Sequence, residues 1–539
     1  MTGILFLALS AQPTRCATPL LYEKKADASC AAKTKAWDKS PKAGPNQGDT
    51  LLLWVMRLDT MPPGWMKLPF VCMRVTANAY IMVEAAALDS GFVTTATVDS
   101  IETAFEDASL GFWPDTGIYV IDTSAFGPPP DEIDNDPRIY LLYYIIEGYM
   151  GYQFDGYFNF ADEYPDSLAW QWWGIHSNER ECVYLDCHNE SPATPRMLGV
   201  LAHEFQHMIH WLGDENEVPW VDEGCAELAM FLYGAPDPLV EFPSNPDNSL
   251  VTWSTGFADY VKTYLWTLYL YEQFDSGFAL TRALVDEDAN SVFGVENALL
   301  SHGAPGMTEV FSRWVVANYL DDTSIYGGLY GYYGEDLPPF APHGIHNSYP
   351  VGPISRTVHL WATDYIRFRN VPDGLQFTFD GQDGKHFFLL AMLFDSSGPT
   401  VVQDISPSNT GQDTSVYLPG VGYQYWQAVI AIAGYPYPLS GDSSNLSYTY
   451  WADGTGVEEA EAGRRIDFWS AGSRVFLSLP VDADVSLRVY DIEGRMIQDM
   501  HEGDLSSGKH EFTLNQPTRG IRIVVLRQDG ETHTLKIVN

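Results

Sequence analysis

The pair His203 and His207, with Glu204 beside the first of them, is the strongest chemical signal in this sequence. They stand in the string His203-Glu204-Phe205-Gln206-His207. Residues four apart on a helix share one face, with Cβ atoms about 5–6 Å apart, so both imidazoles can reach one ion. Zinc accepts imidazole nitrogens at about 2.0–2.1 Å, and a carboxylate beside it can act as a base. The spacing therefore predicts a zinc site; the alternative is a set of polar positions on a solvated helix.

A helix over residues 196–212 has to position this motif. Thr194 and Pro195 suit the N-cap and the first helical position, and Gly213 suits the end of the helix. Gly199, one turn before the first histidine, is expected to leave open space on the histidine side. The opposite side carries an apolar face at helical spacing, made of Leu201, Phe205, Met208 and Leu212.

A second helix, predicted over residues 221–233, supplies candidates for a third ligand. Glu223 and Glu227 stand one turn apart in the string Trp220-Val221-Asp222-Glu223-Gly224-Cys225-Ala226-Glu227. The intervening residues 213–219 are long enough to reverse the chain, so that the two helices run antiparallel. One carboxylate then completes a site with three protein ligands and leaves the fourth zinc position for water.

The two segments together resemble the gluzincin clan of zinc metallopeptidases, in which an HExxH helix is followed by a helix that carries a glutamate ligand. The strings at 203–210 and 220–224 are most similar to secreted bacterial peptidases of the hyicolysin type. The resemblance implies that both histidines of the motif and Glu223 hold zinc. Glu227 is the rival ligand, or else the carboxylate that orients the ring of His203 from outside the coordination sphere.

Such a site predicts hydrolysis of peptide bonds in a protein or peptide substrate. Zinc lowers the pKa of its bound water to about 7, and Glu204 is expected to take the proton as general base and to return it to the leaving amine. Tyr260 and Tyr264, one turn apart on a predicted helix, are candidates for the oxyanion donor, with core packing as the other interpretation. An endopeptidase is favoured; an aminopeptidase, or a surface adhesin with a vestigial zinc site, is the alternative.

Charge and hydropathy exclude other classes of partner. The 539 residues carry a formal net charge of -41, from 71 acidic and 30 basic residues, and this charge repels nucleic acid and anionic membrane surfaces. No apolar run approaches the roughly 18 residues of a membrane-spanning helix. Residues 1–11 are apolar but lack basic side chains, as in an atypical export signal. We therefore expect a secreted or cell-surface bacterial protein without a nucleic-acid partner.

The cysteines and one acidic run give weaker signals. Six cysteines in so long a chain do not make a disulfide framework. Cys182 and Cys187 form either a local bridge or two separate thiols, and Cys16 and Cys225 receive no chemical role. The run Asp131-Glu132-Ile133-Asp134-Asn135-Asp136 clusters oxygen ligands as a calcium site would, with a solvated acidic loop as the simpler interpretation.

Length alone argues for several domains. Residues 1–60 lack sustained periodicity and are expected to be a poorly ordered leader or pro-segment. A zincin-like domain, strand-rich in its upper half and helical in its lower half, is predicted over 61–348. Short strands typical of a β-sandwich follow over 349–453, then a linker, 454–463, and a final β-domain, 464–539. The predicted fold class is multidomain α+β, with a zincin-like catalytic domain followed by two β-sandwich domains.

Hydrophobic periodicity places the elements within the zincin-like part. Strands are predicted over 70–75, 79–84, 117–121 and 183–185, and a short helix over 99–108. Further helices are predicted over 196–212, 221–233, 257–274, 279–286 and 307–320. The metal motif thus lies where the strand-rich half gives way to the helical half.

The last domain carries a resemblance of its own. From Gly463 onward 10 basic residues stand against 11 acidic ones, so nearly all the excess acidity lies upstream. Its strands, through the closing string Leu535-Lys536-Ile537-Val538-Asn539, resemble the immunoglobulin-like C-terminal domains that act as sorting tags in type IX secretion. The resemblance implies a partner in secretion machinery; an inert appended sandwich is the alternative.

Overall fold

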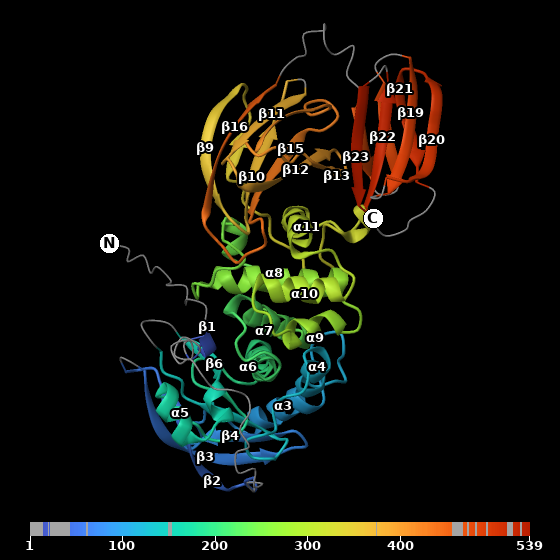
Figure 1. The fold of residues 1–539 in the computed structure, drawn as a ribbon. Helices are drawn as coiled ribbons and strands as arrows, with labels where there is room; N and C mark the ends of the chain where they lie inside the picture. Colours follow the sequence, from blue (N-terminus) through green and yellow to red (C-terminus); the bar gives the residue numbers. More distant parts are fainter. Residues whose placement is uncertain are drawn as a thin grey trace, which may run out of the picture. The chain divides into compact units, whose positions relative to one another are not determined.

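The chain divides into two compact units (Figure 1). The first consists of Met1–Trp314, Leu337–Phe340 and Pro436–Ser443, and the second of Val315–Asp336, Ala341–Tyr435 and Ser444–Asn539. One sheet with its helices belongs to the first unit and four further sheets belong to the second, which confirms the multidomain α+β class. The computed structural model describes residues 15–19, 21, 44–60, 63–148, 153–372, 374–454, 467–471, 474–479, 482–491, 494–514, 521–528 and 531–538.

A mixed sheet of seven strands organises the first unit. The strand order is β1 (Arg15–Cys16), β6 (Phe154–Phe158), β7 (Cys182–Asp186), β5 (Ile139–Tyr144), β4 (Ala79–Glu84), β3 (Gly64–Val75) and β2 (Thr50–Arg57). The central strands β4, β5 and β7 run parallel and are buried along their whole length. Strands covered on both faces read as nearly continuous apolar runs, which explains why the sequence predicted β4 and β7 as strands.

Two parts of the expected leader are strands of this sheet. β2 pairs antiparallel with β3, from Thr50 opposite Val71 to Arg57 opposite Gly64, so the sheet extends upstream of residue 61. β1 pairs parallel with β6, and β6 itself runs antiparallel to β7. The sheet therefore includes residues 15–16 and 50–57 of the segment that we expected to be poorly ordered. Residues 1–14, 20 and 22–43 of that segment lie outside the described part.

Helices pack on the sheet and on one another, and their bounds agree with the predictions to within a few residues. They are α3 (Thr95–Glu106), α6 (Pro195–Gly213), α7 (Pro219–Tyr233), α8 (Phe257–Phe274), α9 (Ala279–Asp286) and α11 (Met307–Leu320). Further helices are α2 (Ala85–Asp89), α5 (Asp166–Trp173) and α10 (Val292–Ser301). The predicted strands 70–75, 79–84 and 183–185 are confirmed as parts of β3, β4 and β7.

The prediction of a strand over residues 117–121 is wrong. These residues start the helix α4 (Ile118–Ala125). Ile118, Ile121 and Ala125 are buried, at intervals of three and four residues, and side chains at these intervals share one helical face. A short apolar run does not distinguish the periodicity of a helix from that of a strand. Packing of this buried face therefore determined that the segment forms a helix.

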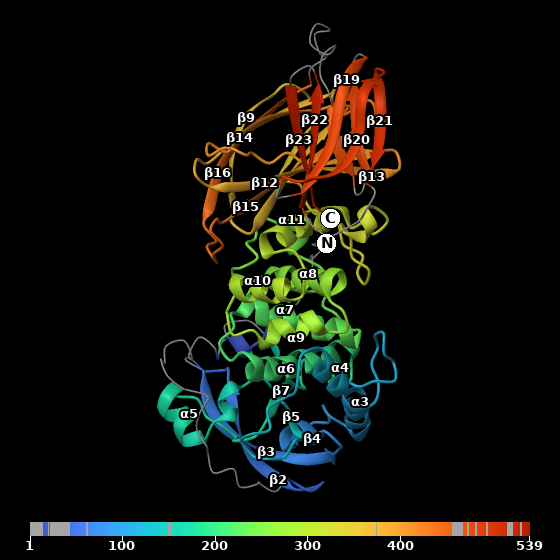
Figure 2. The ribbon, with the colours of Figure 1, turned by 45° about the vertical axis from the view of Figure 1, so that its right-hand side comes forward.

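The helices α6, α7 and α8 lie side by side in sequence order (Figures 1 and 2). The Thr194 side chain accepts a hydrogen bond from the Met197 amide, and Pro195 takes the first helical position of α6, as predicted. α7 starts at Pro219 and is closed by Gly234, whose φ of 99° lies in the left-handed region. Because α6 also packs on β6 and β7, its motif lies close to the end of the sheet order that carries β1.

Two glycines allow close packing around α6 and α7. Gly199 does not leave the open space that we expected, because a Cβ there would lie 2.9 Å from the Ala235 carbonyl oxygen. A Cβ on Gly234 would lie 2.3 Å from the Gly111 nitrogen and 2.4 Å from the Leu110 carbonyl carbon. The C-terminus of α7 is therefore fixed against the loop before α4.

The second unit contains a β-sandwich. Its five-stranded sheet consists of β13 (Gly398–Asp404), β12 (His386–Asp395), β15 (Gln427–Tyr435), β10 (Ala362–Arg369) and β8 (Gly344–His346), in that order. The four-stranded sheet consists of β14 (Asp413–Leu418), β11 (Leu375–Gly381), β16 (Asn445–Asp453) and β9 (Val351–His359). Side chains of the two sheets meet in one core, since the Phe368 and Phe377 ring centroids lie 5.9 Å apart.

A second pair of sheets closes the chain. One sheet contains β17 (Asp467–Ala471), β18 (Arg474–Leu479) and β21 (Gly508–Thr513). The other contains β20 (Met496–Leu505), β19 (Ala483–Asp491), β22 (Ile521–Gln528) and β23 (Glu531–Val538). Alternate residues form the core, for example Val475, Leu477 and Leu479 of β18. Of the predicted linker 454–463, only Gly454 is among the described residues.

Among the described helices, none has both the length and the apolar character that a membrane span needs. Cys182 and Cys187 are both buried free thiols, as are Cys72 and Cys225. Of the two interpretations of the Cys182 and Cys187 pair, the structure therefore has two separate thiols.

Substitution of Gly234 tests the close contact that fixes α7. The change Gly234→Ala puts a side chain at positive φ, which destabilises the folded state by about 1–2 kcal/mol. Overpacking against the neighbouring backbone destabilises it by about 1–3 kcal/mol more. Gly174→Ala is the matched control, because Gly174 caps α5 at a φ of 67° with no atom within 4 Å of the new Cβ. We expect Gly234→Ala to lower the thermal unfolding midpoint of the first unit clearly more than Gly174→Ala does. Equal shifts in calorimetry would contradict the contact.

Candidate metal centre

Three buried side chains of α6 and α7 direct ligand atoms at one point. The Nε2 atoms of His203 and His207 lie 3.1 Å apart. Glu223 Oε2 lies 3.3 Å from the first of these nitrogens and 3.7 Å from the second. Ligand atoms of a tetrahedral zinc, each at about 2.0–2.2 Å from the ion, lie about 3.3–3.6 Å from one another. The structure thus brings the three expected ligands together in a triangle of the size that zinc requires.

The state of the Glu223 carboxylate tests whether a cation fits here. The residue is only 1% exposed, and neither of its oxygens accepts a hydrogen bond from any described residue. A buried carboxylate without hydrogen bonds is costly unless a positive charge faces it. The donor set of two imidazoles and one carboxylate is also the set that zinc accepts in catalytic sites. The residues present therefore fit a zinc ion.

Two further carboxylates of α7 face the other nitrogens of the imidazole rings. Glu227 Oε1 lies 3.3 Å from His203 Nδ1, and Asp222 Oδ1 lies 3.0 Å from His207 Nδ1. A carboxylate at Nδ1 fixes the tautomer with the proton on that nitrogen and leaves Nε2 free to bind a metal. Glu223 and Glu227 thus occupy different positions: the first faces both Nε2 atoms and the second faces the far side of one ring.

Asp222 also faces a third histidine, His210, to which sequence reasoning assigned no role. Its Oδ1 lies 3.1 Å from Nδ1 of His210, a residue that is 1% exposed. Burial opposes a charge on this ring, but Asp222 raises the pKa of His210 to about 10. Burial likewise opposes a charge on Asp222, but His207 and His210 hold its pKa well below the ordinary value. The spacing of the two histidines, three residues apart on α6, is the only signal in the sequence for this bridge.

Glu204, the expected base, is fully buried beside the triangle, and burial raises its pKa. Its Oε2 accepts hydrogen bonds from the Cys16 thiol, at 3.3 Å, and from the Thr18 hydroxyl, at 3.1 Å. Strand β6 approaches it closely, because a Cβ on Gly156 would lie 2.9 Å from the Cγ of Glu204. A residue without a side chain is therefore required at this point of the strand.

Cys16 lies at the centre, although its sequence position gave no hint of this. Its Sγ atom lies 3.6 Å from His207 Nε2. Ligand atoms of Cys16, His203, His207 and Glu223 all lie within 4.8 Å of one another. The pairing of β1 with β6, more than a hundred residues away in sequence, brings the thiol here.

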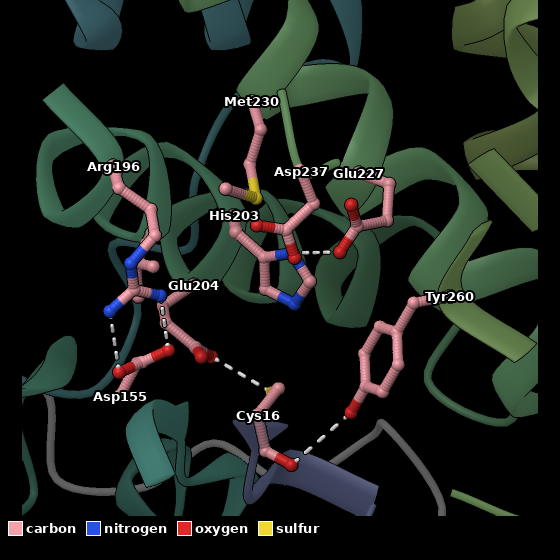
Figure 3. A pocket seen from close by; sticks show the side chains of 10 residues that line it. Cys16, Asp155, Arg196, His203, Glu204, Glu227, Met230, Asp237 and Tyr260 are labelled. Carbon is pink, nitrogen blue, oxygen red and sulfur yellow. Dashed lines mark hydrogen bonds and ion pairs between the residues drawn. The ribbon is translucent and has the colours of Figure 1, made fainter. Parts of the chain in front are cut away.

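A pocket opens beside His203 (Figure 3). One wall is an ion pair in which Arg196 Nη1 lies 2.6 Å from Asp155 Oδ2. Tyr260 points its hydroxyl into the pocket and donates it to the Cys16 carbonyl oxygen, at 3.5 Å. The complete lining consists of Cys16, Asp155, Arg196, Val200, His203, Glu204, Glu227, Met230, Asp237 and Tyr260.

The two tyrosines considered as oxyanion donors differ in position. Tyr260 lines the pocket, with its ring centroid 6.5 Å from that of His203. Tyr264, one turn along α8, is not part of the lining, and its ring packs 6.2 Å from that of Phe231. Of the two tyrosines, only Tyr260 therefore lies close to the motif.

A separate cluster contains part of the acidic run. Carboxylate oxygens of Asp131, Asp134 and Glu181 lie within 4.8 Å of one another. Glu181 is fully buried, neither of its oxygens has a hydrogen-bond partner in the described chain, and burial together with Asp134 raises its pKa to about 9. Arg180 lies 3.4 Å from Asp134 and offsets one of these charges. Glu181, which precedes β7, is the member that sequence reasoning missed.

Comparison with known proteins relates part of the chain to a metalloprotease. Over 264 residues, 44% of this chain, it is 26% identical to the neutral metalloprotease ShpI of Staphylococcus hyicus, and it spans 58% of the length of that protein. No family model matches. Among solved structures, the BSP domain of a biofilm associated protein is 10% identical over 36% of this chain and 52% of that chain, with a TM-score of 0.11, too low to support an argument.

The different positions of Glu223 and Glu227 predict different effects on zinc affinity. We expect Glu227→Gln to weaken zinc binding by roughly 10–100-fold, because it removes only the partner of a ligating ring. Glu223→Gln should weaken binding further, since it removes a ligand. Competition with a chromophoric chelator measures both dissociation constants. The reverse order of the two variants would make Glu227 the ligand.

Proposed function

We propose that this chain is a secreted, zinc-dependent endopeptidase of the gluzincin type, with a protein or peptide as substrate. The observation that carries the proposal is the triangle of His203 Nε2, His207 Nε2 and Glu223 Oε2 with the Glu204 carboxylate beside it. The similarity of part of the chain to a neutral metalloprotease supports the same reaction class.

His203, His207 and Glu223 would hold the ion, while Glu227 and Asp222 would fix the two rings. Zinc in such a site supplies a Lewis acid and lowers the pKa of its water ligand to about 7. Three protein ligands, rather than four, are what a catalytic zinc needs, because one position has to accept water or substrate. The calcium-type and structural zinc sites of proteins do not need a buried base next to them, whereas this site has Glu204.

Glu204 acts as the general base and then as the general acid. Its carboxylate takes a proton from the attacking water and later gives this proton to the amine that leaves. Both transfers need an oxygen of Glu204 within hydrogen-bond reach of the reacting atoms. Its Oε2 lies 3.3 Å from the Cys16 sulfur, which itself lies 3.6 Å from His207 Nε2, so this oxygen is close to the ligand triangle. Burial of the side chain excludes bulk water, which would otherwise compete for the proton.

Tyr260 serves as the donor to the oxyanion. Its hydroxyl already donates to a backbone carbonyl in the pocket, that of Cys16, and it projects from α8 opposite the motif. A donor aimed at a carbonyl oxygen, on an element other than that of the base, is the arrangement that stabilises a tetrahedral oxyanion. Tyr264 remains a core residue in this proposal.

We propose an endopeptidase rather than an aminopeptidase. An aminopeptidase needs acidic groups to bind the ammonium group of its substrate. Of the acidic groups that line the pocket, Asp155 is paired with Arg196, Glu227 faces His203 and Glu204 is the proposed base, which leaves only Asp237 for such a contact. An adhesin with a vestigial site is the other alternative, but such a protein has no use for a base positioned as Glu204 is.

The closing sandwich supports export. Its composition is almost neutral, whereas the rest of the chain is strongly acidic, so it forms a chemically distinct module. We propose that it is the immunoglobulin-like sorting domain implied by its resemblance, and that secretion machinery is its partner. The protein would then act at the cell surface or outside the cell.

Substitution of Glu204 tests the function. Because the Cys16 thiol contacts Glu204, the comparison uses chains that both carry Cys16→Ser. We expect Glu204→Gln to keep zinc and to lower casein hydrolysis by roughly 10²–10⁴-fold, since it removes the base and not a ligand. Zinc content and hydrolysis are measured on the same preparation. Retained hydrolysis would exclude this role, and zinc without hydrolysis in the parent chain would favour the adhesin.

We also propose that Asp131, Asp134 and Glu181 bind calcium. A fully buried carboxylate without hydrogen bonds, facing two others, is stabilised by a hard cation with oxygen ligands. Calcium at roughly 100 times its dissociation constant should add about 2.7 kcal/mol to the stability of the folded state. Glu181→Gln should remove most of this gain, while Asp89→Asn, at an exposed acid on α2, should not. Thermal unfolding with and without calcium measures the effect, and an equal response of both variants would exclude the site.

A further inference from the structure

We propose that Cys16 is the fourth ligand of the metal in a latent form of this protein, and that the segment of residues 15–19 blocks the active site until it leaves. The inference rests on the proposed function, because it assumes that His203, His207 and Glu223 hold zinc. It assigns a role to a cysteine far from the motif in sequence.

The position of the sulfur atom is the first observation. A tetrahedral zinc with a thiolate at about 2.3 Å and a nitrogen at about 2.0–2.1 Å holds these two atoms about 3.5–3.6 Å apart. The Cys16 Sγ atom lies 3.6 Å from His207 Nε2, and all four ligand atoms belong to one cluster. The thiol thus stands where the fourth ligand of the ion would be, the position that a hydrolase needs for water.

The same segment engages the proposed base. The Thr18 hydroxyl donates to Oε2 of Glu204, and the Cys16 sulfur lies 3.3 Å from the same oxygen and donates to it as long as it carries its proton. Bound to the metal as a thiolate, the sulfur would no longer donate, but it would still lie next to this oxygen. The Thr18 hydroxyl also accepts a hydrogen bond from the Phe158 amide of β6, at 2.8 Å, so its orientation is fixed. A reacting water would need the oxygen that these two groups occupy. The segment therefore blocks the base as well as the metal.

The proposed oxyanion donor is engaged too. The Tyr260 hydroxyl donates to the carbonyl oxygen of Cys16 (Figure 3). The three groups that the reaction requires, the open metal position, Glu204 and Tyr260, thus all have a partner in one short stretch of chain.

The backbone of the segment adds a strand to the sheet. β1 pairs in parallel with β6, and the Ala17 amide donates to the Gly156 carbonyl at 3.0 Å. Addition of an extended peptide to a sheet edge is a common way to bind a peptide, with main-chain hydrogen bonds for affinity. Ala17 and Thr18 are fully buried. A substrate could not use this edge of β6 while the segment is bound.

Activation then requires the thiolate to leave. On release the Cys16 sulfur would take a proton from solvent, and the ligand position that it held would become accessible to a solvent molecule. No oxidant or reductant takes part. The whole segment has to leave with it, because Thr18 and the carbonyl of Cys16 would otherwise still occupy Glu204 and Tyr260.

Zinc X-ray absorption on the full-length chain tests the ligand without any assay of activity. We expect one sulfur neighbour at about 2.3 Å in the wild-type chain and none in Cys16→Ser. Cys187→Ser, which removes a buried thiol elsewhere, should keep the sulfur neighbour. Replacement of zinc by cobalt gives a second readout, since a thiolate-to-cobalt charge-transfer band should be present only when Cys16 is. Zinc bound without sulfur in the wild-type chain would overturn the inference and leave the proposed function standing.

Hydrolysis of casein tests the block. We expect Cys16→Ser to hydrolyse casein roughly tenfold faster or more, because a larger fraction of the chains is competent. Cys187→Ser should match the wild type, and Cys16→Ser with Glu204→Gln should stay inactive. A sulfur neighbour without any gain in Cys16→Ser would overturn the inhibitory role. A wild-type chain that binds no zinc would overturn the proposed function itself. The wild-type absorption spectrum decides about the ligand even if Cys16→Ser fails to fold.

Discussion

The close packing of α6 against α7 is the constraint on which the candidate site depends, because it buries acidic groups of one helix against imidazoles of the other. Asp222, Glu223 and Glu227 are all nearly inaccessible, and they face the rings of His203 and His207. Burial of a charged group is tolerated only where an opposite charge or a set of hydrogen bonds compensates it. Two of the carboxylates have an Nδ1 atom to face, and the third faces the Nε2 atoms that a cation would share with it. A bound cation would thus compensate the charge that this packing buries.

The edge of the sheet imposes the second condition. β6 passes so close to α6 that a side chain at Gly156 would strike Glu204. Any peptide that pairs with β6 is therefore brought next to the base and to the ligand triangle. A substrate and an inhibitory segment that pair with β6 would both lie next to the base. This explains why a strand as short as β1 can contact Glu204 and also place its sulfur beside the ligand triangle.

The parts of the site that the sequence reveals are those with local geometry. His203, Glu204 and His207 are neighbours on one helix, so helical spacing alone predicts that they lie together. The preference for Glu223 over Glu227 came from the family resemblance and not from spacing. The role of Asp222 depends on which ring faces it across two helices, and spacing does not determine that. Cys16 could not be predicted, because a two-residue strand has no periodicity and its partner lies more than a hundred residues away. The same ambiguity of short apolar runs explains the error at residues 117–121.

The binding of the segment and of the metal must be coupled. The two-residue pairing of β1 with β6 offers few backbone hydrogen bonds against the entropy of ordering the chain, about 1–2 kcal/mol for each residue. Contacts with the site have to supply the remaining free energy of docking, and a bond from Cys16 to zinc would be the largest of these contributions. If the metal strengthens docking of the segment, then by linkage the segment strengthens retention of the metal by the same factor. The same coupling free energy then underlies both latency and tight metal binding. Departure of the segment would free the fourth ligand position and would weaken the binding of the metal in a single step.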